Sequence, residues 1–471
     1  MSSPPNAPQG VEIGRQRRRA IVASTVGTSI EYYDFFLYGC MAGVVFPTVF
    51  FPASNTYAGI LQSFSRSMAR GDAATFAFGF VARPIGGAVF GHYGDKLGRK
   101  TTLMVTLSLM AVGTVLIGLV PSYHQIGAWS GVLLVALRFV QGLGVGGEWG
   151  GSVLLAMEWA KPNRRGLAAA WPQAAVPIGL LLANGAIALT MVCMPHQQFM
   201  TWGWRVPFLL SVVMFGVGIY IRRRVVESPA FSQVAATRKI AVNPLREVVR
   251  RNWREIGLCA LLSAPDLAAF YIFAVFIFAF AKQQLHLEQS FVTVAVMTGA
   301  AISVFAMPLF GYLSDRVGRR RVYFTALVLL AVWAWMYYAL LNTGAATLVF
   351  AAIAISFIAH AMCHGPQGAL LAESFGTRVR YSGVSLGYQL SSVMAGATAP
   401  LIALALYHHD NRGSGIAAYM FGIAVIGAVA TALLRTRTDA RLHTDVSAPS
   451  SAEIISAPAQ LAATTQSKEA M

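Results

Sequence analysis

Long apolar runs of about 20 residues alternate with short polar links along most of the chain. A helix of this length spans the roughly 30 Å hydrocarbon core of a bilayer. We therefore predict an all-α integral membrane protein with twelve transmembrane helices. The expected helices lie at about 21–47, 73–90, 101–121, 130–157, 166–192, 203–221, 256–281, 290–310, 322–341, 345–370, 383–406 and 416–434.

Two similar decapeptides divide this pattern into halves. GHYGDKLGRK occupies residues 91–100, and GYLSDRVGRR occupies residues 311–320, at a constant offset of 220 residues. Each decapeptide lies between two apolar runs, which predicts a tight turn outside the membrane. The repeat indicates two pseudo-symmetric six-helix bundles.

The charged positions of both decapeptides suggest a gate. A carboxylate such as Asp95 is stabilised at the N-terminus of a neighbouring helix, where backbone N–H groups converge. Arg99 can pair with an acidic residue at the end of another helix. The expected gating residues of both halves are Gly91, Asp95, Gly98, Arg99, Glu158, Asp315, Arg319 and Glu373. The alternative is that these links only set the orientation of the protein in the membrane.

Several further stretches resemble the metabolite:H+ symporter family of the major facilitator superfamily, and the closest branch by overall look contains shikimate permease. The stretches are EYYDF at 31–35, GFVARPIGG at 79–87, RFVQG at 138–142, GGEWGG at 146–151, WGWRVPF at 202–208, ESP at 227–229 and RYSG at 380–383. This resemblance implies the major facilitator fold and proton-coupled import of a small carboxylate or zwitterion. The chain departs from the family at the extra residues 65–73 and at Pro265-Asp266 in helix 7.

The composition fits a membrane protein and argues against a soluble one. Of the 471 residues, 56% are hydrophobic and only 12% are charged, although the net charge is +17. Of the 36 Lys and Arg residues, 29 fall on one side of the predicted helices. This is the positive-inside distribution, so we expect both termini in the cytoplasm of a bacterium and the helices in its inner membrane. The bilayer, and not nucleic acid, accounts for the positive charge.

The polar segments give the expected domain boundaries. They are a cytoplasmic N-terminal segment at 1–20, a six-helix bundle at 21–221, a cytoplasmic central loop at 222–254, a second bundle at 255–434 and a disordered tail at 435–471. The four cysteines show no metal or disulfide spacing. We expect no metal, no cofactor and no nucleotide site.

Charged residues inside the predicted helices are the first candidates for function, because a charge within the bilayer is expensive. Asp34 lies roughly 20 Å from one membrane face and Arg138 roughly 12 Å from the other, so both reach nearly the same depth. Glu31 lies one helical turn from Asp34, and Glu148 lies deeper on the helix of Arg138. We predict that Asp34, Glu31, Arg138 and Glu148 carry proton coupling. The alternative is a static Asp34–Arg138 pair that holds two helices together.

Arg83 is the predicted reader of a substrate carboxylate, because its planar guanidinium binds such a group through two parallel hydrogen bonds. Asp266 is the counterpart of these charges in the second half. The expected substrate-binding residues are Arg83, Gln141, Trp149, Gln173, Asp266, Tyr271, Gln367, Tyr388 and Gln389. The alternative role of Arg83 is packing against helix-end carbonyls, and that of each polar or aromatic residue of this set is packing or hydrogen bonding between helices.

The function expected from these features is that of a proton-coupled symporter, acting as a monomer on a small organic anion or zwitterion by alternating access. Uniport, antiport and symport of a proline- or betaine-type osmolyte remain alternatives. A membrane enzyme would need a cluster of His or Asp residues at one membrane face, and the only candidate is the loop tip His408-His409-Asp410. A receptor would need a large soluble domain, for which the polar segments are too short.

Overall fold

The computed structural model describes residues 9–51, 73–237, 241–410 and 412–434. These residues form helices and short connections, without a strand among them. Twelve long helical segments run side by side. In chain order they are α1 Gln9–Val44, α4 Ala73–Leu97, α5 Arg99–Leu119, α7 Trp129–Glu158, α8 Arg165–Cys193, α10 Arg205–Arg223, α13–η4–α14 Trp253–Gln283, α15 Gln289–Val317, α16 Arg319–Leu341, α17 Ala346–Ala372, α18–η5–α19 Arg380–His409 and α20 Ser414–Leu433.

Ten of these segments are long and apolar enough to cross a membrane, counted over the described residues. The other two, α1 and α4, have 36 and 25 residues and carry several charges along their length. Both are packed inside the bundle, with α1 against α8 and α4 against α7. The predicted all-α membrane fold with twelve helices is confirmed.

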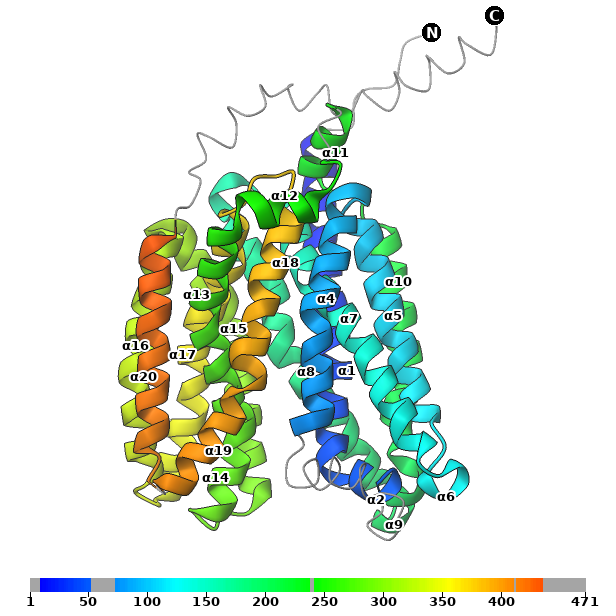
Figure 1. Ribbon diagram of the computed structural model, residues 1–471, viewed down its shortest axis with the longest axis vertical. Helices are drawn as coiled ribbons and strands as arrows, with labels where there is room; N and C mark the ends of the chain where they lie inside the picture. Colours follow the sequence, from blue (N-terminus) through cyan, green and yellow to red (C-terminus); the bar gives the residue numbers. More distant parts are fainter. Residues whose placement is uncertain (1–8, 52–72, 238–240, 411, 435–471) are drawn as a thin grey trace, which may run out of the picture.

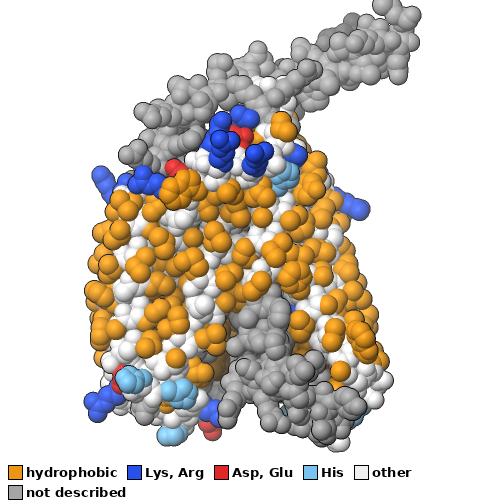
Figure 2. All heavy atoms as spheres, in the orientation of Figure 1, with side chains coloured by type: hydrophobic (Ala, Val, Ile, Leu, Met, Phe, Trp, Pro, Cys, Tyr) orange, Lys and Arg blue, Asp and Glu red, His pale blue; other side chains and the backbone are white. Residues whose placement is uncertain are grey.

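The helices form two halves, α1 to α10 and α13 to α20, that stand side by side (Figure 1). The halves touch through α4 against α18 and through α8 against both α15 and α17. Two short helices, α11 (Pro229–Ala236) and α12 (Pro244–Arg251), lie at one end of the bundle (Figure 1). Lys and Arg side chains gather there (Figure 2), and we call it the basic end. The opposite end is the far end, with the short helices α2 (Phe46–Val49), α6 (Tyr123–Ile126) and α9 (His196–Gln198).

The two decapeptides differ from the predicted loops. Residues 91–97 continue α4, and residues 311–317 continue α15. Only one residue, Gly98 or Gly318, therefore separates each helix from the next. Gly98 has a φ of 102° and Gly318 a φ of 105°. Because side chains with a Cβ rarely adopt this conformation, glycine lets one helix end and the next begin without a loop.

Two helices also extend beyond the predicted boundaries. α1 begins at Gln9, inside the predicted N-terminal segment 1–20, and α10 continues to Arg223. The central stretch 222–254 is therefore largely helical. Most of the extra residues 65–73 and the whole tail 435–471 lie outside the described residues.

Candidate transport site and gate

Two acidic residues of α1 point into the interior of the first half. Asp34 is fully buried, and its Oδ1 accepts a hydrogen bond of 2.6 Å from the Ser211 hydroxyl of α10. Glu31 is 1% exposed, and neither of its carboxylate oxygens has a hydrogen-bond partner among the described residues. A carboxylate in this situation is costly when ionised, which makes both groups candidates for carrying a proton.

Two buried arginines lie beside these acids. The Arg138 guanidinium donates to Gln141 at 3.2 Å and lies 4.1 Å from the centre of the Tyr38 ring. It is close enough to Asp34 for the two charges to interact, although the Asp34 hydrogen bond described above comes from Ser211. Gln141 in turn donates to the Thr114 hydroxyl at 2.7 Å. The predicted partners Asp34 and Arg138 are thus neighbours within a wider polar network.

Arg83 of α4 is held by aromatic rings. Its Cζ lies 4.6 Å from the centre of the Phe35 ring and 4.3 Å from that of Phe80. Arg83 also interacts electrostatically with Tyr271 of the second half. Its Nη2 is buried without a hydrogen-bond partner among the described residues. Arg83 therefore has one buried donor with unused hydrogen-bonding capacity among the described residues.

Glu148 has a different neighbourhood from the one predicted. It forms an ion pair with Arg222 and accepts a hydrogen bond of 2.7 Å from Thr106. Arg222 reaches Glu148 because α10 continues into the stretch expected to be a loop, and it is 2% exposed. The pair links α7 to the last turn of α10, so Glu148 has a strong partner that the sequence pattern did not reveal.

The second half places Asp266 between two histidines of α17. Asp266 Oδ2 lies 2.7 Å from Nδ1 of His364, and Oδ1 lies 3.2 Å from Nε2 of His360. All three side chains are at most 3% exposed, and the two imidazoles stack with centres 5.1 Å apart. We call this set the Asp–His–His cluster. The remaining predicted residue nearby, Gln367, donates to the Tyr323 hydroxyl at 3.3 Å.

The donor types of this cluster would suit a transition metal, but the spacing of its closest pair, His364 and Asp266, is that of a hydrogen bond. Two ligands of a tetrahedral zinc ion lie roughly 3.4 Å apart, given metal–ligand bonds of about 2.1 Å. The separation of 2.7 Å between His364 and Asp266 is shorter and matches a charge-assisted hydrogen bond. A shared proton fits this spacing better than an ion.

Four of the predicted substrate residues form a bridge between the halves. Trp149 of α7 stacks on Tyr388 of α18 with ring centres 3.6 Å apart. The Trp149 indole N–H donates to Gln173 at 2.7 Å, and Gln173 donates to the His364 carbonyl at 3.1 Å. Gln389 donates to backbone carbonyls of α7 at 3.3 Å. In this conformation these side chains join the halves directly.

At the basic end, Asp95 of α4 caps the first turn of α18. Its carboxylate accepts hydrogen bonds from the backbone N–H groups of Tyr381 at 3.1 Å and Ser382 at 2.9 Å, and from the Ser382 hydroxyl at 2.8 Å. Backbone N–H groups at a helix N-terminus favour an anion. Asp95 therefore ties the first half to the second.

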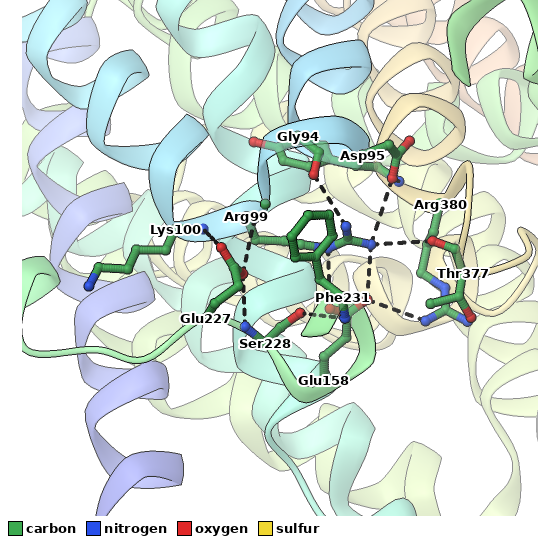
Figure 3. A network of polar contacts seen from close by, with 12 residues as sticks. Gly94, Asp95, Arg99, Lys100, Glu158, Glu227, Ser228, Phe231, Thr377 and Arg380 are labelled. Atoms are coloured by element: carbon green, nitrogen blue, oxygen red, sulfur yellow. Dashed lines mark hydrogen bonds and ion pairs between the residues drawn. The ribbon is translucent and has the colours of Figure 1, made fainter. Parts of the chain in front are cut away.

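Arg99 extends this contact into a network (Figure 3). Its guanidinium lies 3.2 Å from Glu158 and 3.6 Å from Asp95, and it donates to the Thr377 carbonyl of the second half at 3.4 Å. Glu158 is also 3.4 Å from Arg380. With the Asp95 contacts, the network thus crosses between the halves at three points at the basic end.

Glu227, which precedes α11 in the chain, also belongs to this network. Its carboxylate accepts hydrogen bonds from the backbone N–H groups of Arg99 and Lys100, both at 3.1 Å (Figure 3). Burial raises the pKa of the Glu227 carboxyl, while its backbone donors and Arg99 act in the opposite direction. Glu227 therefore caps α5 at the turn made by Gly98.

The second decapeptide builds the same arrangement. Asp315 accepts hydrogen bonds of 2.8 Å from the backbone N–H groups of Gly166 and Leu167, at the N-terminus of α8. Arg319 lies 2.7 Å from Asp315 and 2.6 Å from Glu373. Each decapeptide therefore connects its own half to the other half at the basic end.

Sequence reasoning missed several residues of these sites. They are His360, His364, Arg222, Ser211, Glu227 and Ser382. The histidines had a signal, because two ionisable residues four apart lie on one face of an apolar helix. Arg222 looked like one of many basic loop residues, and nothing in the sequence pattern singled it out.

Comparison with known proteins places the chain in a family. The model of the Major Facilitator Superfamily matches residues 26–400 and, in a second alignment, residues 300–464. The chain belongs to the Major Facilitator Superfamily. The predicted resemblance is confirmed. A solved structure of the proton:xylose symporter XylE has the same fold, with a TM-score of 0.69, 18% identity and coverage of 89% of this chain and 95% of that chain.

Three similar proteins are bacterial superfamily transporters. The inner membrane metabolite transport protein YhjE of Escherichia coli is 40% identical over 89% of this chain and 94% of its own length. The shikimate transporter of the same organism is 37% identical over 89% of this chain and 94% of its own length. The citrate-proton symporter of Klebsiella pneumoniae is 33% identical over 92% of this chain and 95% of its own length. The chain is thus a multi-pass inner-membrane transporter of small molecules, and not an enzyme.

Proposed function

We propose that this transporter imports a small organic anion together with protons. The observation that carries the proposal is the pairing of two buried carboxylates, Asp34 and Glu31, with two buried arginines, Arg83 and Arg138, within one transporter half. Carboxylates there can bind protons, and arginines can bind a carboxylate substrate. The name of the citrate-proton symporter supports the same combination.

Asp34 is the proton carrier in this proposal. Its protonation removes the negative charge beside Arg138, so the guanidinium becomes available to an anionic substrate. A proton therefore binds before the substrate. After the transporter opens to the other side, the substrate leaves and Arg138 again stabilises the ionised carboxylate, which releases the proton. Glu31, one turn away, is the rival carrier.

Arg83 is the proposed substrate-binding residue. The rings of Phe35 and Phe80 fix the guanidinium, and its Nη2 points to no partner among the described residues. Since Tyr271 of the second half lies close to Arg83, a substrate bound here contacts both halves. Shikimate-like acids and mono- or dicarboxylates have the required group, whereas an osmolyte such as betaine adds a positive charge that Arg83 would repel.

The gate and the orientation complete the proposal. The networks around Asp95 and Asp315 hold the basic end closed, and their release opens it. We assign the basic end and both termini to the cytoplasm, because Lys and Arg concentrate on that side. Transport then needs only one chain, and we propose that the monomer is the functional unit.

A stabilisation screen tests the proposed substrate class. Purified protein is heated with small carboxylates, betaines and neutral sugars, and a ligand that binds the folded state raises the unfolding temperature. We expect stabilisation by a carboxylate in wild-type protein and not in the Arg83→Gln variant. Stabilisation by a sugar or a betaine alone would contradict the proposal.

A further inference from the structure

The second half holds a group of ionisable side chains that the proposed mechanism does not use. Asp266 of α13 lies between His360 and His364 of α17, which are one helical turn apart. These are the partners that the structure gives Asp266, and no Lys or Arg of the described chain forms an ion pair with it. With two neutral imidazoles, the cluster would carry one uncompensated negative charge in the interior.

We infer that the Asp–His–His cluster is a second proton-binding site, in addition to the carboxylates of α1. One added proton makes the cluster neutral overall, as an imidazolium beside a carboxylate. A neutral cluster is far cheaper to bury than a net charge. The distance of 2.7 Å between His364 Nδ1 and Asp266 Oδ2 matches the charge-assisted hydrogen bond that such a pair forms.

Three further neighbours of the cluster carry no charge. Among the described residues, Tyr323 of α16, Cys363 of α17 and Tyr388 of α18 also interact electrostatically with Asp266. All three are uncharged in their ordinary form at neutral pH. Phe270 covers the His360 ring at 5.2 Å between centres. The charge state of the cluster therefore depends on its own three members.

The cluster is also attached to the moving interface. Gln173 of the first half donates to the backbone carbonyl of His364, and Phe270 contacts Phe36 of α1 with ring centres 5.8 Å apart. When the halves separate, these contacts break and water reaches the cluster. The second nitrogens of both imidazoles, Nδ1 of His360 and Nε2 of His364, have no partner among the described residues, so they are open to that water.

This inference rests on the proposed symport, and it predicts that two protons accompany each substrate. It can be tested separately from transport. Full-length protein labelled with ¹⁵N in the imidazole rings is placed in lipid vesicles and freed of metal by a chelator. Nitrogen resonances are followed from about pH 8 to about pH 5, a range in which imidazoles titrate. His360→Gln and His364→Gln assign the two rings.

We expect the pair to gain one proton in this range in wild-type protein, and Asp266→Asn to lose that uptake. The exposed His196 provides the control, since His196→Gln should leave both resonances unchanged. If both rings stay neutral throughout, or if one metal ion per chain stays bound after chelation, the inference is wrong. That outcome would leave a one-proton symporter with Asp34 as its carrier intact.

Transport gives a second readout once a substrate is known. With the membrane potential clamped at zero, a gradient of about one pH unit supports roughly tenfold accumulation for one proton and roughly 100-fold for two. We expect substrate accumulation to be roughly 100-fold in wild-type protein and roughly tenfold in the His360→Gln/His364→Gln variant. Equal accumulation by the variant and the wild type would overturn a transported second proton, whereas no accumulation by wild-type protein would overturn the symport itself.

Discussion

At the scale of single residues, the interior of the first half contains charged side chains that have few polar partners. Arg83 is supported by two aromatic rings, and Glu31 has no hydrogen-bond partner for either oxygen among the described residues. Such groups respond strongly to a ligand or a proton because little else stabilises their charge. Two sets of substitutions at this scale test ligand binding and backbone geometry separately.

Arg83→Lys keeps the positive charge but removes the planar pair of donors. We expect the KM for a carboxylate substrate to rise by roughly tenfold or more, which corresponds to about 1.4 kcal/mol, with little change in protein yield. Uptake kinetics in vesicles measure this effect. If the Lys variant transports like wild-type protein and Arg83→Ala lowers only the yield, Arg83 has a structural role instead.

Gly98→Ala and Gly318→Ala form a matched pair. Both force alanine into a φ near 100° that is otherwise adopted almost only by glycine, which costs about 1–3 kcal/mol of folding stability. At Gly98 the new methyl group would also collide with the Glu227 carboxylate, whereas at Gly318 it meets no other part of the described chain within 4 Å beyond its neighbours in sequence. Thermal unfolding should therefore show a clearly larger loss for Gly98→Ala. Equal losses would mean that Glu227 does not depend on the Gly98 turn.

At the scale of helices, the decisive contacts join a carboxylate of one half to a helix N-terminus of the other. Asp95 binds the first turn of α18, and Asp315 binds the first turn of α8. In the proposed gating, these contacts break when the basic end opens. Their loss should therefore change the population of closed and open states more than it changes the fold.

Asp95→Ala removes three hydrogen bonds to one carboxylate, so the closed state should lose about 3 kcal/mol or more relative to the open state. Spin labels on the basic ends of α4 and α18 should report longer distances, with transport lost and expression kept. Asp410→Ala, which removes a similar cap on an exposed turn, is the control. Unchanged distances in Asp95→Ala would refute a gating role.

The helices themselves could be predicted from the sequence, but most contacts between them could not. Long apolar runs and the repeated decapeptide predicted the helices, because hydrophobic burial acts on every residue of a run. The helical course of residues 91–97 was missed, since polar residues at a helix end look like a loop. His360 and His364 were missed because their role depends on Asp266, which lies on another helix and is 94 or more positions away. Contacts between helices are set by packing, which a single sequence does not display.

At the scale of the whole molecule, two similar halves enclose the charged interior, and ion pairs and helix caps join them at the basic end. The halves differ in chemistry, because the first contains arginines beside carboxylates and the second contains histidines beside one carboxylate. Under the proposed function, anion binding belongs to the first half. The proposal also assigns the gate at the basic end to the cytoplasmic side, so it depends on the orientation of the protein in the membrane.

Cysteine labelling tests the orientation. Single cysteines replace His196 at the far end and Thr237 at the basic end, both exposed, in a background without Cys193. In intact cells a membrane-impermeant reagent should label position 196, and it should label position 237 only after the membrane is opened. Labelling of both positions from the same side would contradict the two-sided arrangement.

The central claim is that Asp34 carries the coupled proton, and the Asp34→Asn variant tests it most directly. Asparagine mimics the permanently protonated form. In vesicles loaded with the carboxylate identified by the stabilisation screen, the variant should exchange labelled for unlabelled substrate at a rate close to that of wild-type protein. When a pH gradient is applied, it should lose the part of the accumulation that the Asp34 proton drives, and Asp34→Asn combined with His360→Gln and His364→Gln should not accumulate substrate at all. Accumulation by this combined variant, together with its loss when Glu31→Gln is added, would contradict the claim and assign the proton to Glu31.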